Sequence, residues 1–197
     1  MINNKQLLSS IFFAIMILIF QMLYIRKEQN MDVQLFHTIN DWAGKNHLLD
    51  QFMILCSKWG IYLFIFLILG AIVNTKSQRL GIYGGISLVM ALLISRVLKY
   101  TIDRERPFLT EQVHLLFEKS ASPSFPSDQG AICGVFIATF WLIAPKWRWL
   151  TITLAMLVAI SRVFVGHHYP TDVITGLVIG IICFVVVQRL PFWKKTA

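Results

Sequence analysis

Six long apolar runs, separated by short polar segments, dominate the sequence. They cover roughly residues 6–25, 51–74, 80–101, 128–144, 149–166 and 171–190. A run of about 20 apolar residues is long enough to cross the hydrocarbon core of a bilayer as a helix. The pattern therefore predicts an all-α integral membrane protein. We expect a six-transmembrane-helix bundle in one domain over residues 1–197, with its motif-bearing core at about 51–190.

The segment between the first two runs carries a second, shorter helical pattern. Leu35, Ile39 and Trp42 share one helical face, and Asp32 precedes them as a capping residue. A short amphipathic helix of this kind suits the boundary between water and lipid. We therefore predict a short interfacial helix within residues 26–50.

Composition agrees with a membrane bundle. Only 14% of the residues are charged, whereas a soluble domain carries about 25%. The apolar part of the first run, Leu7 to Ile25, is longer than the 7–15 residues usual in a signal peptide, and no small-x-small cleavage site follows it. We therefore expect this run to remain as the first span, and the six runs leave no room for a separate soluble domain.

The charge distribution predicts an orientation. With six spans both termini lie on one side, and the segments on that side carry no acidic residue but eight basic ones: Lys5, Lys76, Arg79, Lys146, Arg148, Arg189, Lys194 and Lys195. Lysine and arginine in short segments mark the cytoplasmic side. We therefore expect cytoplasmic termini. The net charge of +8 is on this interpretation an orientation signal and not a nucleic-acid-binding patch.

Three polar clusters stand at the opposite, extracytoplasmic ends of the spans. They lie at Lys99 to Pro107, Ser124 to Gln129 and Ser161 to Asp172. Titratable groups beside hydrocarbon are costly, so they are candidates for function. Several cations together suit a phosphate-bearing ligand. The clusters predict one composite anion site at this membrane surface.

Local spacing suggests how the first two clusters are built. A helix continuing past Lys99 would place Arg106 on the same face two turns later, with Pro107 ending it soon after. Ser127 and Asp128 are positioned to begin a helix, whose free N–H groups and dipole favour an anion.

The third cluster predicts a nucleophile. Pro170 fits the first turn of the last span and leaves His168 just before it and Asp172 just inside it. That geometry allows Asp172 to accept a bond from one imidazole nitrogen while the other attacks. Arg162 is expected to meet the phosphate, and His167 to point elsewhere in a structural role.

These residues resemble the three signature motifs of the type 2 phosphatidic acid phosphatase superfamily. The matching segments are Lys99-x6-Arg106-Pro107, then Pro126-Ser127, then Ser161-Arg162-x5-His168-x3-Asp172. Phe125-Pro126-Ser127-Asp128 and Val165-Gly-His-His-Tyr-Pro look like the bacitracin-resistance-type undecaprenyl-diphosphate phosphatases of bacteria. The resemblance covers roughly residues 30–190.

The resemblance implies hydrolysis through a phosphohistidine, without metal or other cofactor. His168 and Asp172 are then the catalytic pair, and phosphate is bound by Lys99, Arg106, Ser127, Asp128 and Arg162. The implied substrate is undecaprenyl diphosphate in the bacterial plasma membrane, so the protein would recycle the carrier for peptidoglycan synthesis and confer bacitracin resistance. The alternatives are a phosphatidylglycerol-phosphate or other lipid phosphate phosphatase, and a non-catalytic polyprenyl-phosphate binder.

Gln129 departs from the family pattern, in which a histidine at this position is the general acid. An amide cannot supply a proton, and losing a general acid costs about 10²–10⁴-fold in rate. We favour an engineered, inactivated variant; a natural diphosphatase that works without the acid and a natural lipid binder stay open. His114, Glu118 and Asp128 are conceivable substitute acids, and nothing in the sequence selects among them.

Overall fold

The computed structural model describes residues 29–190, and all of its regular elements there are helices. They are α2 (Gln29–Asn40), α3 (His47–Val73), α4 (Gln78–Ile102), α5 (Pro107–Thr110), α6 (Asp128–Ile143), the 3-10 turn η1 (Pro145–Trp147), α7 (Arg148–Phe164) and α8 (Pro170–Arg189). The expected first span at 6–25 lies outside the described residues.

Five of the expected spans fall within the described part of the chain, and each is a helix. Four segments are long and apolar enough to cross a membrane: His47–Val73, Gln78–Thr110, Pro145–Phe164 and Pro170–Arg189. The fifth, α6, is apolar but has only 16 residues. It is also the central helix, because it contacts α3, α4, α7 and α8. The helical bundle expected from the apolar runs is therefore confirmed for this part of the chain.

Small residues bring α6 and α8 into close contact. Gly130 and Gly134 of α6 lie against backbone of α8, and a Cβ added at Gly134 would overlap the carbonyl of Leu177. Gly176 and Gly180 do the same from α8 toward α6. Small residues four apart are a common means by which membrane helices approach closely. This packing places the first residues of both helices at the same end of the bundle.

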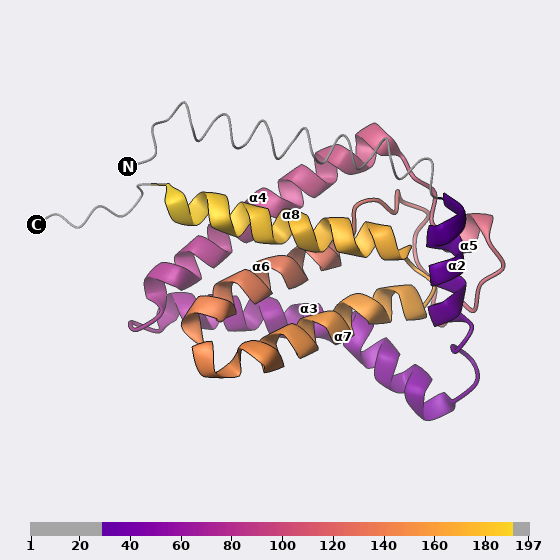
Figure 1. Cartoon of the computed structure of the whole chain (residues 1–197), viewed down its shortest axis with the longest axis horizontal. Helices are drawn as coiled ribbons and strands as arrows, with labels where there is room; N and C mark the ends of the chain where they lie inside the picture. The colour runs from indigo at the N-terminus through magenta and orange to yellow at the C-terminus, as the bar shows by residue number, and fades with distance from the viewer. Residues whose placement is uncertain (1–28, 191–197) are drawn as a thin grey trace, which may run out of the picture.

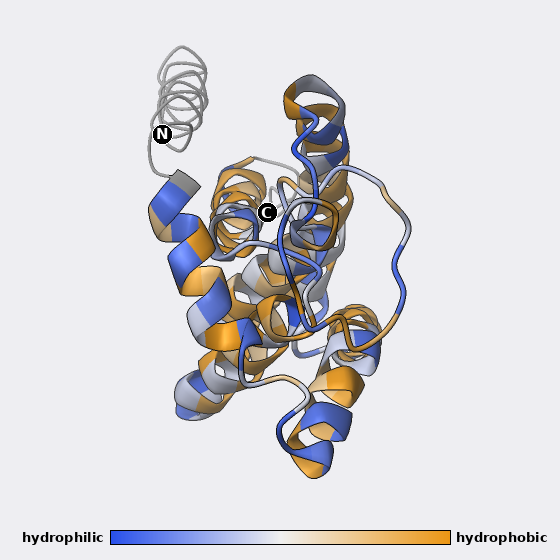
Figure 2. Ribbon diagram, turned by 90° about the vertical axis from the view of Figure 1, so that its right-hand side faces the viewer, coloured by the Kyte–Doolittle hydropathy of each residue, from blue (hydrophilic) through white to orange (hydrophobic). Residues whose placement is uncertain are grey.

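The short helix α2 lies across that end of the bundle, beside α5 and the long segment between α4 and α6 (Figure 1). Viewed from this end, these segments carry many hydrophilic residues, whereas the helices behind them are largely hydrophobic (Figure 2). The polar clusters are thus gathered at one end. The α3–α4 and α6–α7 connections lie at the other (Figure 1).

The short helix expected within residues 26–50 is α2, and two residues of its predicted apolar face are exposed. Leu35 is 48% exposed and Trp42, beyond the end of the helix, is 60% exposed. The buried residues are instead Asp32, Phe36 and Asn40, which recur every four residues and face α7 and α8. Asp32 lies within the first turn and is not a cap. Two of these three are polar, so a hydrophobic pattern could not identify this face.

Candidate active site

His168 lies in the turn between α7 and α8, where Pro170 begins the last helix as predicted. Its Nδ1 is 3.0 Å from the carbonyl oxygen of Ser124, and its Nε2 is 3.2 Å from Nη1 of Arg106. A guanidinium can only donate hydrogen bonds. Nε2 therefore carries the lone pair, and Nδ1 donates its proton to Ser124. This is the tautomer that an attacking Nε2 needs.

The surroundings keep His168 uncharged. Burial lowers the pKa of His168 well below its usual 6.5, and the nearby cations Arg106, Arg162, Lys99 and Lys119 lower it further. A lowered pKa means that the imidazole stays neutral down to acidic pH. The site thus holds a buried, oriented imidazole among several positive charges.

The direct His168–Asp172 hydrogen bond expected from the sequence is not formed. The Asp172 Oδ2 to His168 Nδ1 distance is 3.7 Å, which is too long for a hydrogen bond. Asp172 instead accepts from the backbone N–H of Tyr169 at 2.9 Å and from Arg104 Nη1 at 2.8 Å. Because both oxygens have these partners, Asp172 holds the turn that carries His168, and Ser124 orients the ring.

Arg104 belongs to a buried ion-pair network and not to the set of cations free to bind an anion. Its Nη2 donates to Asp32 of α2 at 2.7 Å, and its guanidinium carbon lies 4.0 Å from the ring centre of Tyr169. Asp32 also accepts from the backbone N–H of Thr171 at 3.1 Å and from its hydroxyl at 2.5 Å. Through Arg104, α2 therefore supports Asp172 and the start of α8.

Replacing Asp32 with asparagine should destabilise the protein and reduce its activity. The change leaves the charge of Arg104 compensated by Asp172 alone, and breaking a buried ion pair costs about 3–5 kcal/mol. Thermal unfolding in detergent measures the effect. Asp41→Asn is the matched control, because the Asp41 side chain is 57% exposed and pairs only with His37 among the described residues. Equal melting temperatures for the two variants would contradict this assignment.

Arg106 reaches His168 by a different path from the one predicted. The helix does not continue past Lys99 to Arg106: α4 ends at Ile102, and Asp103 adopts a left-handed conformation with φ 47°. The extended chain that follows buries the Arg106 side chain. It donates to the carbonyl oxygens of Ser122 at 2.7 Å and His167 at 2.9 Å. Arg106 is thereby fixed beside His168.

Arg162 enters the site from α7 and is only 2% exposed. Its Nη1 donates to the hydroxyl and the carbonyl oxygen of Ser57, and its Nη2 lies 2.8 Å from His167 Nδ1. The other ring nitrogen of His167 donates to the Phe117 carbonyl at 3.0 Å. Burial, followed by the charge of Arg162, lowers the pKa of His167 to about 3. His167 is thus a neutral acceptor that positions Arg162, which agrees with the structural role expected for it.

The start of α6 contributes the remaining predicted residues. Ser127 caps the helix, as expected, by accepting from the N–H of Gly130 at 3.2 Å. Lys99 forms an ion pair with Asp128. The expectation that Asp128 itself binds phosphate conflicts with this arrangement, because its carboxylate repels an anion and already pairs with a cation. Its neighbour Gln129 faces a cavity next to the site.

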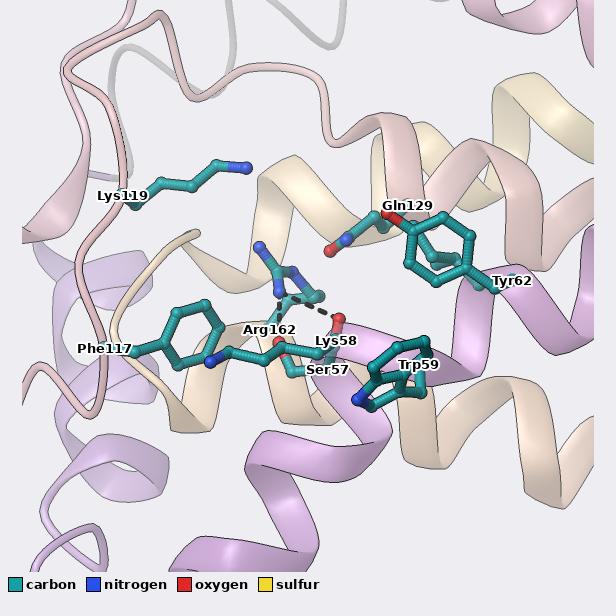
Figure 3. A pocket seen from close by; sticks show the side chains of 9 residues that line it. Ser57, Lys58, Trp59, Tyr62, Phe117, Lys119, Gln129 and Arg162 are labelled. Atoms are coloured by element: carbon teal, nitrogen blue, oxygen red, sulfur yellow. Dashed lines mark hydrogen bonds between the residues drawn. The ribbon is translucent and has the colours of Figure 1, made fainter.

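That cavity has a volume of about 330 Å³. It is lined by residues of α3, the α4–α6 segment, α6 and α7, namely Ser57, Lys58, Trp59, Ile61, Tyr62, Phe117, Lys119, Gln129 and Arg162 (Figure 3). Within residues 29–190, no group of three or more histidine, cysteine or carboxylate side chains is arranged to hold a metal ion. The described residues bring together a neutral imidazole, two buried guanidinium groups and a cavity lined by both polar and apolar groups.

Comparison with known proteins places this arrangement in a family. The PAP2 superfamily model matches residues 80–196. Undecaprenyl-diphosphatase BcrC of Bacillus subtilis is 33% identical over 156 residues, covering 77% of this chain and 80% of that protein. An undecaprenyl-diphosphatase of Sulfolobus acidocaldarius is 36% identical over 179 residues, covering 86% of each.

The fold agrees as well. The crystal structure of a transmembrane PAP2-type phosphatidylglycerolphosphate phosphatase from Bacillus subtilis matches with a TM-score of 0.68 at 24% identity, covering 90% of this chain and 96% of that one. The family indicated by the sequence motifs is thus confirmed, and the apolar helices are those of a multi-pass membrane protein. The chain belongs to the PAP2 superfamily.

Proposed function

We propose that this chain is a lipid phosphatase that hydrolyses undecaprenyl diphosphate to undecaprenyl phosphate and inorganic phosphate. The observation that carries the proposal is the buried imidazole of His168, held by Ser124 with its Nε2 lone pair beside Arg106. The substrate is supported by the two relatives named undecaprenyl-diphosphatases, which are 33% and 36% identical to this chain.

The reaction begins with attack by Nε2 of His168 on the terminal phosphorus. A nitrogen–phosphorus bond forms while the bond from phosphorus to the bridging oxygen breaks, and the electron pair leaves with the lipid monophosphate. Water then cleaves the phosphohistidine to release inorganic phosphate. A nucleophile of this kind divides one difficult step into two easier ones.

Cations stabilise the charge on the transferred phosphoryl group. Arg106, Arg162 and Lys99 supply positive charge, and the hydroxyl hydrogen of Ser127 stays available because its oxygen accepts from Gly130. The first N–H groups of α6 have no partner within the helix and favour an anion. Asp128 assists indirectly by holding Lys99. Preorganised donors are worth most where water is excluded.

Gln129 attenuates the reaction because it cannot protonate the leaving group. The leaving group of a diphosphate is a phosphate monoester with a second pKa of about 6, so it departs without a proton far more readily than an alkoxide. A diphosphate is therefore the substrate that suffers least from Gln129. Whether the glutamine is natural or engineered does not alter this chemistry.

We further propose that the site faces the extracytoplasmic side of a bacterial plasma membrane. Lys76 lies in the α3–α4 connection and Lys146 in η1, and Arg79 and Arg148 lie in the first turns of α4 and α7. The α3–α4 and α6–α7 connections are at the end of the bundle opposite α2 (Figure 1), and basic residues there favour the cytoplasm. On that side of the membrane the enzyme would recycle the lipid carrier of peptidoglycan synthesis. It would also remove the diphosphate that bacitracin sequesters.

Phosphate release by the purified protein in detergent tests this function. We expect a higher kcat/KM for undecaprenyl diphosphate than for undecaprenyl phosphate or phosphatidylglycerol phosphate, because only the diphosphate has a leaving group that needs no proton. Faster release from phosphatidylglycerol phosphate would favour the alternative phosphatase. Binding of the diphosphate without release, persisting in Gln129→His, would favour a non-catalytic binder.

A further inference from the structure

Lys119 is a cation at the site that belongs to none of the signature motifs. It lies in the segment between α5 and α6 and lines the cavity together with Gln129 and Arg162. Figure 3 shows its amine pointing across the cavity toward the side chains of these two residues. The attack on phosphorus described above gives Lys119 no role.

The cavity is lined by both polar and apolar groups. Trp59, Ile61, Tyr62 and Phe117 provide apolar and aromatic surface, whereas Lys119, Gln129 and Arg162 provide charge and hydrogen-bonding groups. Its volume of about 330 Å³ falls within the range of small-molecule sites. A ligand that fits these walls has an anionic group joined to a hydrocarbon chain.

Two residues that line the cavity each have a buried polar atom with no hydrogen-bond partner among the described residues. These atoms are Nε of Arg162, a donor, and Oε1 of Gln129, an acceptor. Buried polar atoms are nearly always paired, so an unpaired one requires an explanation. An anion would pair with the Arg162 donor. The amine of Lys119 has three donors, enough to serve both Gln129 Oε1 and the same anion.

Lys119 also lies where positive charge accumulates. Burial lowers the pKa of Lys119, and the charges of Arg162, Arg106 and Lys99 lower it further, while Asp128 acts in the opposite direction. Positive charges that lie close to one another are stabilised by a bound anion. The other lysine at the cavity, Lys58, places its amine 4.4 Å from the ring centre of Phe117. Lys119 is therefore the lysine placed to serve a ligand beside Arg162 and Gln129.

We propose that this cavity binds the second, lipid-linked phosphate of a diphosphate substrate, and that Lys119 stabilises that phosphate as it leaves. The inference rests on the proposed function. When the phosphorus–oxygen bond breaks, the bridging oxygen keeps the electron pair, and Lys119 supplies positive charge without giving up its proton. Gln129 orients the Lys119 amine, and the aromatic wall accepts the first part of the hydrocarbon chain. Lysine and glutamine together thus replace the proton donor that the family pattern has at position 129.

Three substitutions test the role of Lys119: Lys119→Gln, Lys119→Arg and, as a matched control, Lys45→Gln. Lys45 lies over the Trp42 ring at the same end of the bundle, outside the cavity. We expect Lys119→Gln to lower kcat/KM for undecaprenyl diphosphate by about 10- to 100-fold, the value of a hydrogen bond to a charged group. Undecaprenyl phosphate, which has no second phosphate, should be affected only about threefold or less. Lys119→Arg should retain most activity, and Lys45→Gln all of it.

Equal losses on both substrates, or no loss on the diphosphate, would overturn this assignment. Binding separates it from a failure of the proposed function. If the unsubstituted protein releases no phosphate, titration with undecaprenyl diphosphate and undecaprenyl phosphate still measures the second-phosphate contact. Lys119→Gln should then weaken binding of the diphosphate about tenfold or more and leave the monophosphate unchanged. Equal affinities of Lys119→Gln and the unsubstituted protein for the diphosphate would contradict the inference.

Discussion

Replacing His168 with alanine will abolish phosphate release, lowering kcat by roughly 10⁴-fold or more. The loss is expected because no other described imidazole can take its place. Both nitrogens of the His167 ring are already hydrogen-bonded, one to Arg162 and the other to the Phe117 carbonyl oxygen. Phosphate release from undecaprenyl diphosphate measures the effect. His37→Ala is the control, because His37 lies on the outer face of α2, with its side chain 33% exposed.

The pH dependence provides a second readout of the same residue. Only the neutral imidazole attacks, and burial together with Arg106 lowers the pKa of His168 below 6.5. Activity should therefore persist at pH values below 6.5 and fall only as the pH drops through this lowered pKa.

A His168→Ala variant that keeps a tenth of the activity would show that another residue is the nucleophile.

Replacing Gln129 with histidine should give the largest gain. Gln129 borders the cavity beside Arg162, so an imidazole there can protonate the oxygen that leaves. General acids contribute about 10²–10⁴-fold, and we expect a gain in this range on undecaprenyl phosphate and phosphatidylglycerol phosphate, whose leaving groups are alkoxides. The gain on undecaprenyl diphosphate should be smaller, because its leaving group is already stable as an anion. Initial rates on the three lipids measure the difference.

Gln51→His is the matched control, since Gln51 is an exposed residue near the start of α3. It should leave all three rates unchanged. Adding His168→Ala to Gln129→His should remove the gain completely. No gain on any lipid from Gln129→His would exclude a missing proton as the cause of low activity.

Local signals in the sequence were sufficient to predict where the helices that carry the site begin. Pro170 marks the first residue of α8, and Ser127 caps α6, because proline at a helix start and a serine cap act within one turn of chain. The long apolar runs likewise identified α3, α4, α7 and α8 as candidate spans. Such features depend on neighbours in sequence and are therefore visible without a structure.

Long-range polar contacts were not visible in this way. Asp32 and Thr171 are 139 residues apart, yet they share hydrogen bonds, and Arg104 has a carboxylate on each side of it. Hydrophobic periodicity carries no information about buried polar partners. For the same reason the sequence predicted an Asp172–His168 bond in place of the Ser124 carbonyl, a backbone group that no motif specifies.

The proposed replacement for a proton donor at position 129 could be identified only from the structure. Glu118 and His114 were candidates from the sequence, but neither lines the cavity, and Asp128 is paired with Lys99. Lys119 lies in an irregular segment with no periodic pattern, and only the fold brings it opposite Gln129. Lys119 is a candidate for stabilising the leaving phosphate because of its neighbours in space and not because of its neighbours in sequence.

Covalent trapping tests the central claim, that His168 is the nucleophile of a composite phosphate site. The purified protein and its His168→Ala variant are mixed with undecaprenyl diphosphate carrying ³²P in the terminal phosphate, quenched within milliseconds to seconds and digested. We predict an acid-labile, base-stable label on the peptide that contains His168, and none in the variant. Turnover without label, or a label that persists in His168→Ala, would contradict the account.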